Sequence, residues 1–314
     1  CMIEFIPILG VKKGIWASVF QSISAFCNAG IDVVAPDSMI GFNASPLLMV
    51  VTMILIVLGG LGFVVWFDLL DGVKKGVRQR HSITGIFKHL PEHSKVVLFM
   101  TGVLLLFGTL AVLFFEYDNP ATIGNMSLGG KIINSLFQSV TFRTAGFATI
   151  PQESMTEVTC IIGYILMFIG GSPVGTAGGI KTVTAFLFFM NAFSYVTGRK
   201  EIVVFNRRVP EEVMRKAAAI VLISMTTVVV ATLLLMVFDK VGLVDAMFEV
   251  VSALGTVGLT RGLTPGLDAA GRIIIIVSMY LGRIGPISMA IFFAKGGGAA
   301  TNMIKHADGR FYVG

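Results

Sequence analysis

The sequence has little charge and little cysteine. Charged residues make up 13% of the 314 positions, whereas 55% are hydrophobic, and a typical soluble domain carries roughly 25% charge. A soluble fold of this composition would leave much apolar surface in water, so the composition argues against a soluble enzyme and against a disordered chain. The three cysteines, Cys1, Cys27 and Cys160, form no CxxC pair and no cluster with histidine. A disulfide framework and a cysteine-held metal site are therefore excluded.

Long apolar runs fill much of the chain, and a membrane helix needs about 20 such residues. Four runs qualify: 47–67, 96–115, 217–238 and 273–294. A fifth, 160–193, is interrupted by the letters GGSPVGTAGG. The sequence therefore predicts an all-α, polytopic membrane protein.

Lysine and arginine gather in 71–95, in 199–216 and from Lys295 through the tail 296–314. The positive-inside rule places these segments in the cytoplasm of a cell that carries the protein in its plasma membrane. The net charge of +6 then follows from topology and anionic lipid, and no nucleic-acid partner is needed.

Three short segments resemble one another: FQSISAFCNAGI at 20–31, FQSVTFRTAGF at 137–147 and FEVVSALGTVGL at 248–259. Gly30, Gly146 and Gly258 recur at nearly equal spacing. Each segment is too short to span a bilayer and suits a re-entrant hairpin entered from the outer side. The repeat predicts units of span, pore loop and span.

Irregular backbone at membrane depth must be buried in protein or line a water-filled cavity. Carbonyls beside small residues can form a ring that replaces the hydration shell of a potassium ion. The sequence therefore predicts a cation selectivity filter made of Cys27, Asn28, Ala29, Gly30, Arg143, Thr144, Ala145, Gly146, Gly255, Thr256, Val257 and Gly258. The Arg143 side chain would repel a cation, so we expect it to brace the loop or to meet extracellular water. Acids of the outer loops can concentrate cations: Asp32, Asp37, Glu116, Asp118, Glu153, Asp245 and Glu249.

An isolated glycine in a membrane protein is more often a helix-packing contact, and Gly59, Gly60 and Gly62 are interpreted in this way. The interruption at 170–181 is different, because each glycine costs a helix about 1 kcal/mol and each proline about 3 kcal/mol. We expect an irregular intramembrane loop there, called the gate loop because the family resemblance described below implies that it obstructs the pore, with a simple packing kink as the alternative. Its residues are Gly170, Gly171, Ser172, Pro173, Val174, Gly175, Thr176, Ala177, Gly178, Gly179 and Lys181. Ser172, Thr176 and Thr182 are expected to face water or an ion.

Arg283 lies inside the last apolar run, where an isolated arginine costs at least about 2.5 kcal/mol. We expect it to donate to carbonyls of the gate loop, with an arginine reaching to the interface as the alternative. The sequence offers no enzyme site. Ile180 separates Gly179 from Lys181 and breaks the phosphate-loop pattern, and Val174 stands where a nucleophile elbow needs glycine.

The segments FQSVTFRTAGF and GGSPVGTAGGIKT resemble the Trk/Ktr/HKT superfamily of potassium transporters, and within it the membrane subunits of Ktr systems. The resemblance implies four units around one pseudo-fourfold pore, with one key glycine per unit. This sequence holds three, so the first unit is expected to be missing. It also implies a homodimer in the bilayer on a cytosolic ring. Nucleotide (ATP/ADP or NAD) would bind that ring only, and this chain would carry no cofactor, with K⁺ as the transported ion.

On this interpretation, residues 1–70 hold the pore loop and inner helix of unit two, and 96–198 hold unit three with its gate loop at 170–181. Unit four covers 217–295. The segments 71–95, 199–216 and 296–314 are cytoplasmic. The predicted function is potassium conduction in an uptake system. The alternative is a secondary transporter with broken helices, for Na⁺ or a small solute.

The first testable consequence is geometric. Gly30, Gly146 and Gly258 should converge on one axis, with a gap where a fourth loop belongs. Coordinates that scatter the three glycines on separate surfaces would contradict a shared pore.

Overall fold

The fold is helical in a computed structural model that describes residues 1–35, 37–79, 87, 89–199 and 201–285. Two of its helices are long and apolar enough to cross a membrane, α6 (Glu92–Phe115) and α10 (Glu211–Asp239). A third candidate span is the bent pair α3 (Pro46–Leu61) and α4 (Phe63–Gln79), if the pair is counted as one. The remaining apolar helices are shorter.

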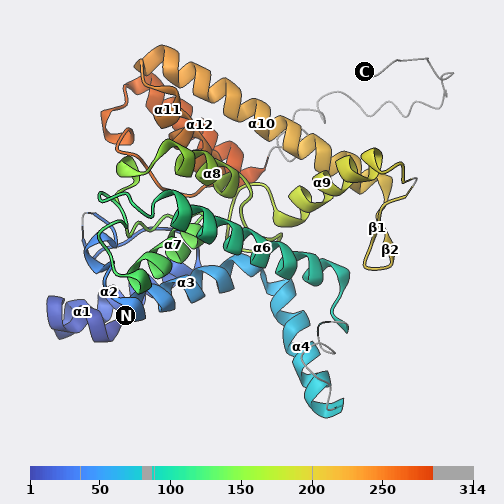
Figure 1. The fold of residues 1–314 in the computed structure, drawn as a ribbon, viewed down its shortest axis with the longest axis horizontal. Helices are drawn as coiled ribbons and strands as arrows, with labels where there is room; N and C mark the ends of the chain where they lie inside the picture. The colour runs from blue at the N-terminus through green and yellow to red at the C-terminus, as the bar shows by residue number, and fades with distance from the viewer. Residues whose placement is uncertain (36, 80–86, 88, 200, 286–314) are drawn as a thin grey trace.

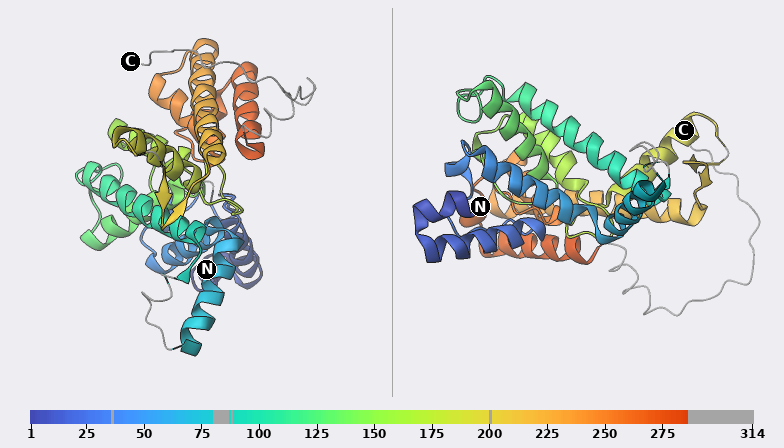
Figure 2. Two further views of the ribbon diagram at one scale, coloured as in Figure 1. Left: turned by 90° about the vertical axis from the view of Figure 1, so that its right-hand side faces the viewer. Right: turned by 90° about the horizontal axis from the view of Figure 1, so that it is seen from below.

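The helices form three groups that follow one another along the chain (Figure 1). The first contains α1 (Met2–Leu9), α2 (Val11–Phe26), α3 and α4. The second contains α6, α7 (Leu128–Phe142), α8 (Glu157–Phe168) and α9 (Thr182–Val196). The third contains α10, α11 (Leu243–Gly255) and α12 (Ala269–Ile284). In the left view of Figure 2 they are stacked in chain order, from blue through green to orange.

Each group repeats one pattern: a short helix that ends at a predicted filter segment, a single 3₁₀ turn, and an inner helix. The short helices, called pore helices below, are α2, α7 and α11, and the 3₁₀ turns are η1 (Ile40–Phe42), η2 (Gln152–Ser154) and η3 (Thr264–Gly266). The inner helices are α3, the pair α8 and α9, and α12. This order of helices is compatible with units of span, pore loop and span, which stay a prediction.

Local signals explain where several helices begin. Ser127 and Thr156 precede α7 and α8, and their hydroxyls accept hydrogen bonds from Gly130 N at 3.3 Å and Thr159 N at 3.4 Å. Such caps satisfy donors that have no partner inside the helix. Pro46 occupies the first turn of α3, where its missing N–H costs nothing.

The prediction of one straight span at 47–67 is wrong. The apolar run covers two helices, and α4 turns away from α3 by 98° (Figures 1 and 2). Gly62 lies between them with φ of 83°, a left-handed conformation that glycine adopts without strain. Gly62 therefore ends α3, and it is also a close contact, since a Cβ there would lie 2.7 Å from Pro173 O.

The other runs agree better with the sequence. Residues 217–238 lie within α10, and the break in 160–193 separates α8 from α9. The helix expected at 273–294 begins earlier, at Ala269, and α12 ends at Ile284; residues 286–294 and the tail 296–314 lie outside the described residues. The segment 199–216 holds a two-residue hairpin of β1 (Val203–Val204) and β2 (Arg207–Arg208), so the described chain is not purely helical.

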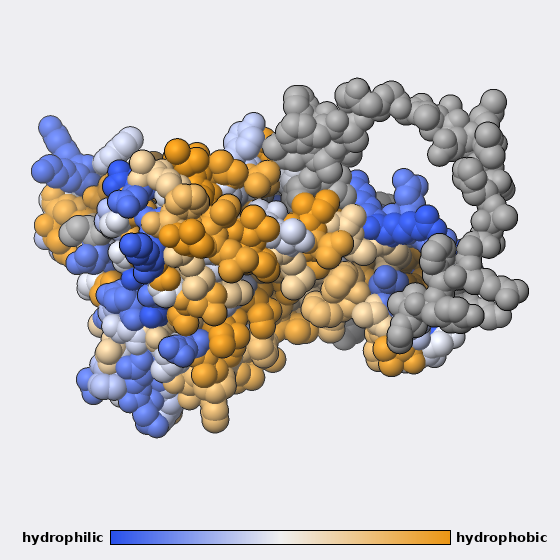
Figure 3. All heavy atoms as spheres, turned by 90° about the horizontal axis from the view of Figure 1, so that it is seen from above, coloured by the Kyte–Doolittle hydropathy of each residue, from blue (hydrophilic) through white to orange (hydrophobic). Residues whose placement is uncertain are grey.

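The outer surface suits lipid along its middle. Figure 3 shows a broad hydrophobic face between two hydrophilic ends. Large apolar side chains are exposed on α6 and α10, among them Phe107, Phe114, Leu222 and Val237. Exposing so much apolar surface to water would be unfavourable, whereas contact with lipid is not, which agrees with a membrane protein.

Gly59 provides a test of the contact between α3 and the filter. A Cβ at this position would lie 1.8 Å from Phe26 O, whereas nothing lies within 4 Å of a Cβ at Gly102 on α6. We expect Gly59→Ala to lower the melting temperature of the purified protein, because backbone must move. Gly102→Ala is the matched control and should leave it unchanged or slightly higher. Equal melting temperatures would show that α3 does not press on the filter segment.

Candidate functional site

The structure brings Gly30, Gly146 and Gly258 together. A Cβ on Gly30 would lie 2.7 Å from Gly146 Cα, and a Cβ on Gly146 would lie 3.0 Å from Gly30 Cα and 2.4 Å from Val257 O. The nearest atom to a Cβ on Gly258 is Gly146 Cα at 3.8 Å. The segment that contains Gly146 therefore lies between the other two filter segments, and this close approach leaves no room for a side chain at Gly146.

The three filter segments share one backbone shape. Asn28, Thr144 and Thr256 have φ of 51°, 69° and 52°, and the glycines two residues later have φ of 66°, 92° and 92°. A left-handed conformation in a non-glycine residue costs of order 1–3 kcal/mol and concentrates at functional sites. The same costly pair of conformations occurs in three different sequences, which indicates that the shape is required.

A hydroxyl from each pore helix holds the far end of its own filter segment. Ser24, Thr141 and Ser252 donate to the carbonyls of Ile31, Phe147 and Leu259, each at 2.6 Å. The backbone carbonyls of the same three residues accept from the middle filter residues, Ala29 N at 2.9 Å, Ala145 N at 3.0 Å and Val257 N at 2.8 Å. Each of these three pore-helix residues is therefore joined to its filter segment by two hydrogen bonds, one donated by its hydroxyl and one accepted by its carbonyl.

The sequence analysis missed these hydroxyls, although the aligned repeat contains them. Ser24 and Ser252 stand six residues before their glycines, and Thr141 stands one residue closer to Gly146. A second repeated position, Gln21, Gln138 and Glu249, ties each pore helix to the loop beyond the filter. Gln138 pairs with Gln152 at 2.7 Å, and Glu249 accepts from Thr264 at 2.7 Å.

The predicted gate loop lies against the inner end of the filter. Thr176 Oγ1 donates to Asn28 Oδ1 at 2.8 Å, and Gly178 N donates to Thr144 Oγ1 at 3.2 Å. A Cβ on Gly178 would lie 1.9 Å from Thr256 Oγ1. The first left-handed residue of every filter segment therefore meets the loop.

The end of α3 holds the loop in this position. Ser172 N donates to Gly60 O at 3.0 Å and Thr176 N donates to Gly59 O at 3.2 Å. The Ser172 hydroxyl also donates to the carbonyls of Gly60 and Leu61. The last carbonyls of a helix lack partners within it, so the break at Gly62 supplies the acceptors that the loop needs.

Two polar residues of this region are not where the sequence analysis expected them. Ser172 is 1% exposed and Thr182 is fully buried, so neither faces water. Two backbone hydrogen bonds join the two ends of the loop: Gly170 N donates to Ile180 O and Thr182 N donates to Gly171 O, both at 3.0 Å. A loop whose ends are joined by two backbone hydrogen bonds differs from a packing kink, in which a helix bends at one or two residues.

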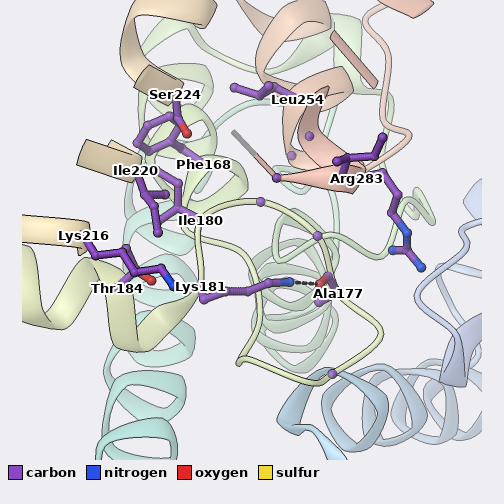
Figure 4. Close-up of a pocket in the computed structure, with 17 residues that line it drawn as sticks. Phe168, Ala177, Ile180, Lys181, Thr184, Lys216, Ile220, Ser224, Leu254 and Arg283 are labelled. Atoms are coloured by element: carbon purple, nitrogen blue, oxygen red, sulfur yellow. Dashed lines mark hydrogen bonds between the residues drawn. The ribbon is translucent and has the colours of Figure 1, made fainter. Parts of the chain in front are cut away.

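Below the loop lies a cavity of about 380 Å³, shown in Figure 4. Arg283 Nη1 donates to Thr176 O at 3.1 Å, which agrees with its expected role, and Lys181 Nζ donates to Ala177 O at 2.6 Å. Lys216 on α10 lines the same cavity. Three basic side chains therefore line the cavity below the loop.

Arg143 does not line the filter with its side chain. It is 8% exposed, and its Nη2 donates to Gly170 O at 3.1 Å. The expectation was that it braces the filter loop or meets extracellular water; the buried side chain instead holds the gate loop, at Gly170. Cys27, which stands at the matching position in the first group, is exposed.

Two of the acids that the sequence placed at an outer mouth, Glu116 and Glu249, are buried. Glu116 is fully buried and accepts from Asn119, Thr122 and Thr156 at 2.7–2.9 Å. Asp245 pairs with Arg261 at 2.8 Å. Burial raises the pKa of the Asp32 carboxyl above its ordinary value, and its hydrogen bond with Ser38 opposes that shift. Within the described part of the chain, no three His, Cys, Asp or Glu side chains group as metal ligands.

The family TrkH, described as "Cation transport protein", matches residues 5–301. The chain belongs to the TrkH family. The Ktr system potassium uptake proteins B of Bacillus subtilis and Vibrio alginolyticus are 36% and 37% identical over 99% of this chain, which spans 66% and 65% of their length.

Two further proteins extend the comparison. The potassium/sodium uptake protein NtpJ of Enterococcus hirae is 34% identical over 99% of the chain and 67% of its own length. The crystal structure of the potassium transporter TrkH from Vibrio parahaemolyticus shares the fold, with a TM-score of 0.68 over 93% of this chain and 68% of that one, at 18% identity.

The role of the pore-helix hydroxyls can be tested by one serine-to-alanine substitution. We expect Ser252→Ala to destabilise the protein by about 1–3 kcal/mol, because Leu259 O loses a buried donor. Ser278→Ala is the matched control. Its buried hydroxyl donates only to Ile274 O of its own helix, so its removal should cost little. The measurement is the thermal midpoint of the purified protein, and equal losses for both variants would contradict a special role for Ser252.

Proposed function

We propose that this chain forms the ion-conducting part of a potassium uptake system. The observation that carries the proposal is the meeting of three glycine strands of one shape, with the gate loop against their inner end. Strands of this kind can present carbonyls in place of the hydration shell of K⁺. Relatives that bear the names of potassium uptake proteins support the same ion.

A fourth strand would complete the filter. A Cβ on Gly146 would meet a neighbouring filter segment on either side, whereas the nearest atoms to a Cβ on Gly30 or on Gly258 belong to the Gly146 segment. The open side between Gly258 and Gly30 is where a further unit would fit. We propose that the conducting assembly contains such a unit outside these 314 residues.

The gate loop would control passage. Bonds from the end of α3, from Arg143 and from Arg283 hold it below the filter, and the cationic side chains beneath it oppose an entering cation. Opening would require these bonds to exchange for others. The cytoplasmic segments near 71–95 and 199–216 are the proposed contacts for a second copy of the chain and for a cytosolic ring that binds nucleotide, which would pull on the loop.

The choice of ion is open to a direct measurement. The name of the Enterococcus relative includes sodium, so Na⁺ is the competing substrate. We expect the intact transporter in proteoliposomes to carry K⁺ and Rb⁺ in preference to Na⁺. Gly146→Ser should weaken this preference more than Gly258→Ser, because a side chain at Gly146 meets both neighbouring strands. Rb⁺/Na⁺ competition that neither variant changes would remove the filter assignment.

A second set of variants tests the gate. Thr176→Val removes a hydroxyl that donates to Phe26 O and Asn28 Oδ1, and each lost bond should shift the closed state roughly two- to tenfold toward opening. Arg283→Gln and deletion of 174–178 should likewise raise initial K⁺ uptake and reduce dependence on the cytosolic ring. Thr226→Val is the matched control, since its hydroxyl donates to Leu222 O on the exposed face of α10.

The gate measurement is the initial uptake rate with and without the ring, at matched membrane expression. Wild-type rates and full ring dependence in all three gate variants would mean that the loop is a packing element.

A further inference from the structure

Neighbouring groups of helices are tied together just beyond their filter segments, and the two ties follow one plan. Ala148 follows the second filter segment and bonds to the loop that leads into η1 of the first group. Met39 N donates to Ala148 O at 2.9 Å, and Ala148 N donates to Ser38 Oγ at 3.2 Å. Arg261 follows the third segment and bonds to η2 of the second group. In both cases a filter segment is joined to the 3₁₀ turn region of the preceding group.

The tie at Arg261 is made by a single side chain. Its Nε donates to Asp245 Oδ1 of α11 at 2.8 Å, its Nη1 donates to Gln152 O at 2.8 Å, and its Nη2 donates to Glu153 O at 3.1 Å. Nη1 also donates to Met155 O at 3.4 Å. The Arg261 side chain is 12% exposed, so these bonds are largely shielded from water. Arginine presents five donors in a rigid planar fork, which lets one residue fix several acceptors in a set arrangement.

The contacts of Arg261 continue to a pore helix on either side. In the second group, the Gln152 side chain exchanges two hydrogen bonds with Gln138 of α7, at 2.7 and 3.2 Å. In the third group, Asp245 lies in the first turn of α11. One chain of polar contacts therefore runs from one pore helix to the next, through Gln138, Gln152, Arg261 and Asp245.

The repeat does not predict this arginine. The matching positions, three residues after the glycines of the other two segments, hold Val33 and Thr149. Val33 is exposed and Thr149 is fully buried. Arg261 is therefore particular to the contact between the second and third groups, where it stands in for the backbone bonds that join the first group to the second.

We propose that Arg261 is a positioning residue for ion selection, a role that rests on the proposed function. The preference of a carbonyl ring for one ion depends on the size of the ring or on the number and field strength of its carbonyls, and the spacing of the segments sets both. Arg261 acts on that spacing, since its fork joins two adjacent filter segments beyond their ends. Without the fork, the two segments can separate or close on a smaller ion, and the ring discriminates less between K⁺ and Na⁺.

The test compares variants of the intact transporter in proteoliposomes. Arg261→Gln removes the fork, and we expect it to lower the Rb⁺/Na⁺ preference roughly two- to tenfold, the range that one net hydrogen bond covers. Arg261→Lys keeps the charge beside Asp245 but cannot hold several carbonyls at once, so it should lower the preference to a similar extent.

Tyr164→Phe is the matched control. The Tyr164 hydroxyl on α8 donates to Val244 O on α11 at 2.7 Å, so it joins the same two groups away from η2. Its loss should lower the thermal midpoint of the purified protein and leave the ion preference unchanged.

Hydrogen exchange measures the tie without transport. Backbone N–H groups at 152–156 should exchange faster in Arg261→Gln than in the unaltered protein, because η2 loses the side chain that holds its carbonyls. Asp245→Asn removes the ion pair and keeps the carbonyl contacts, so exchange at 152–156 should change less in this variant.

The outcomes separate the role of Arg261 from the proposed function. An unchanged ion preference in Arg261→Gln, beside an unaltered protein that carries K⁺, would overturn the proposal. Full recovery in Arg261→Lys would also overturn it, because the effect would then belong to charge, and so would an equal loss in Tyr164→Phe, which would indicate general destabilisation. An unaltered protein that carries neither K⁺ nor Rb⁺ would instead remove the proposed function and with it the role in selection, while faster exchange in Arg261→Gln would still establish the tie.

Discussion

The structure depends on one constraint, which is that irregular backbone inside a membrane must find its hydrogen-bond partners within the protein. The three predicted filter segments and the predicted gate loop are not helical, and each finds its partners at the end of a helix. Pore-helix hydroxyls and carbonyls hold the filter segments. The exposed carbonyls at the end of α3 receive the loop. The broken helices and the irregular segments therefore complete one another.

The sequence predicted the features that glycine and periodicity mark. The repeat around Gly30, Gly146 and Gly258 was visible because the neighbouring residues repeat as well, and ten residues with five glycines and a proline can hardly be a helix. The break at Gly62 was not predictable in the same way. Gly59, Gly60 and Gly62 lie in one apolar run, and only contacts with Phe26 and the gate loop decide which of them ends the helix. The burial of Ser172 was unpredictable for the same reason. The sequence does not show that α3 packs against this part of the loop.

Two arginines act on the same loop from different places. Arg143 binds its first carbonyl, at Gly170, and Arg283 binds a later one, at Thr176. Arg283 was singled out from the sequence because a charge inside an apolar run is rare. Arg143, next to a filter glycine, was harder to interpret, because its side chain leaves the filter and enters the protein. Neither arginine alone holds the loop in place, and the end of α3 makes more hydrogen bonds to the loop than either arginine does.

The three filter strands belong to one chain, and so each position around the axis can differ. The residues before the left-handed ones are Cys27, Arg143 and Gly255. In a ring of identical subunits a guanidinium at this position would appear in every subunit, and the mutual repulsion of those charges would grow with their number. Among these three segments the charge occurs once. A gene that encodes its pore as fused, diverged copies can therefore place a single asymmetric charge beside a nearly symmetric pathway, and selection can adjust one quadrant while its neighbours stay fixed.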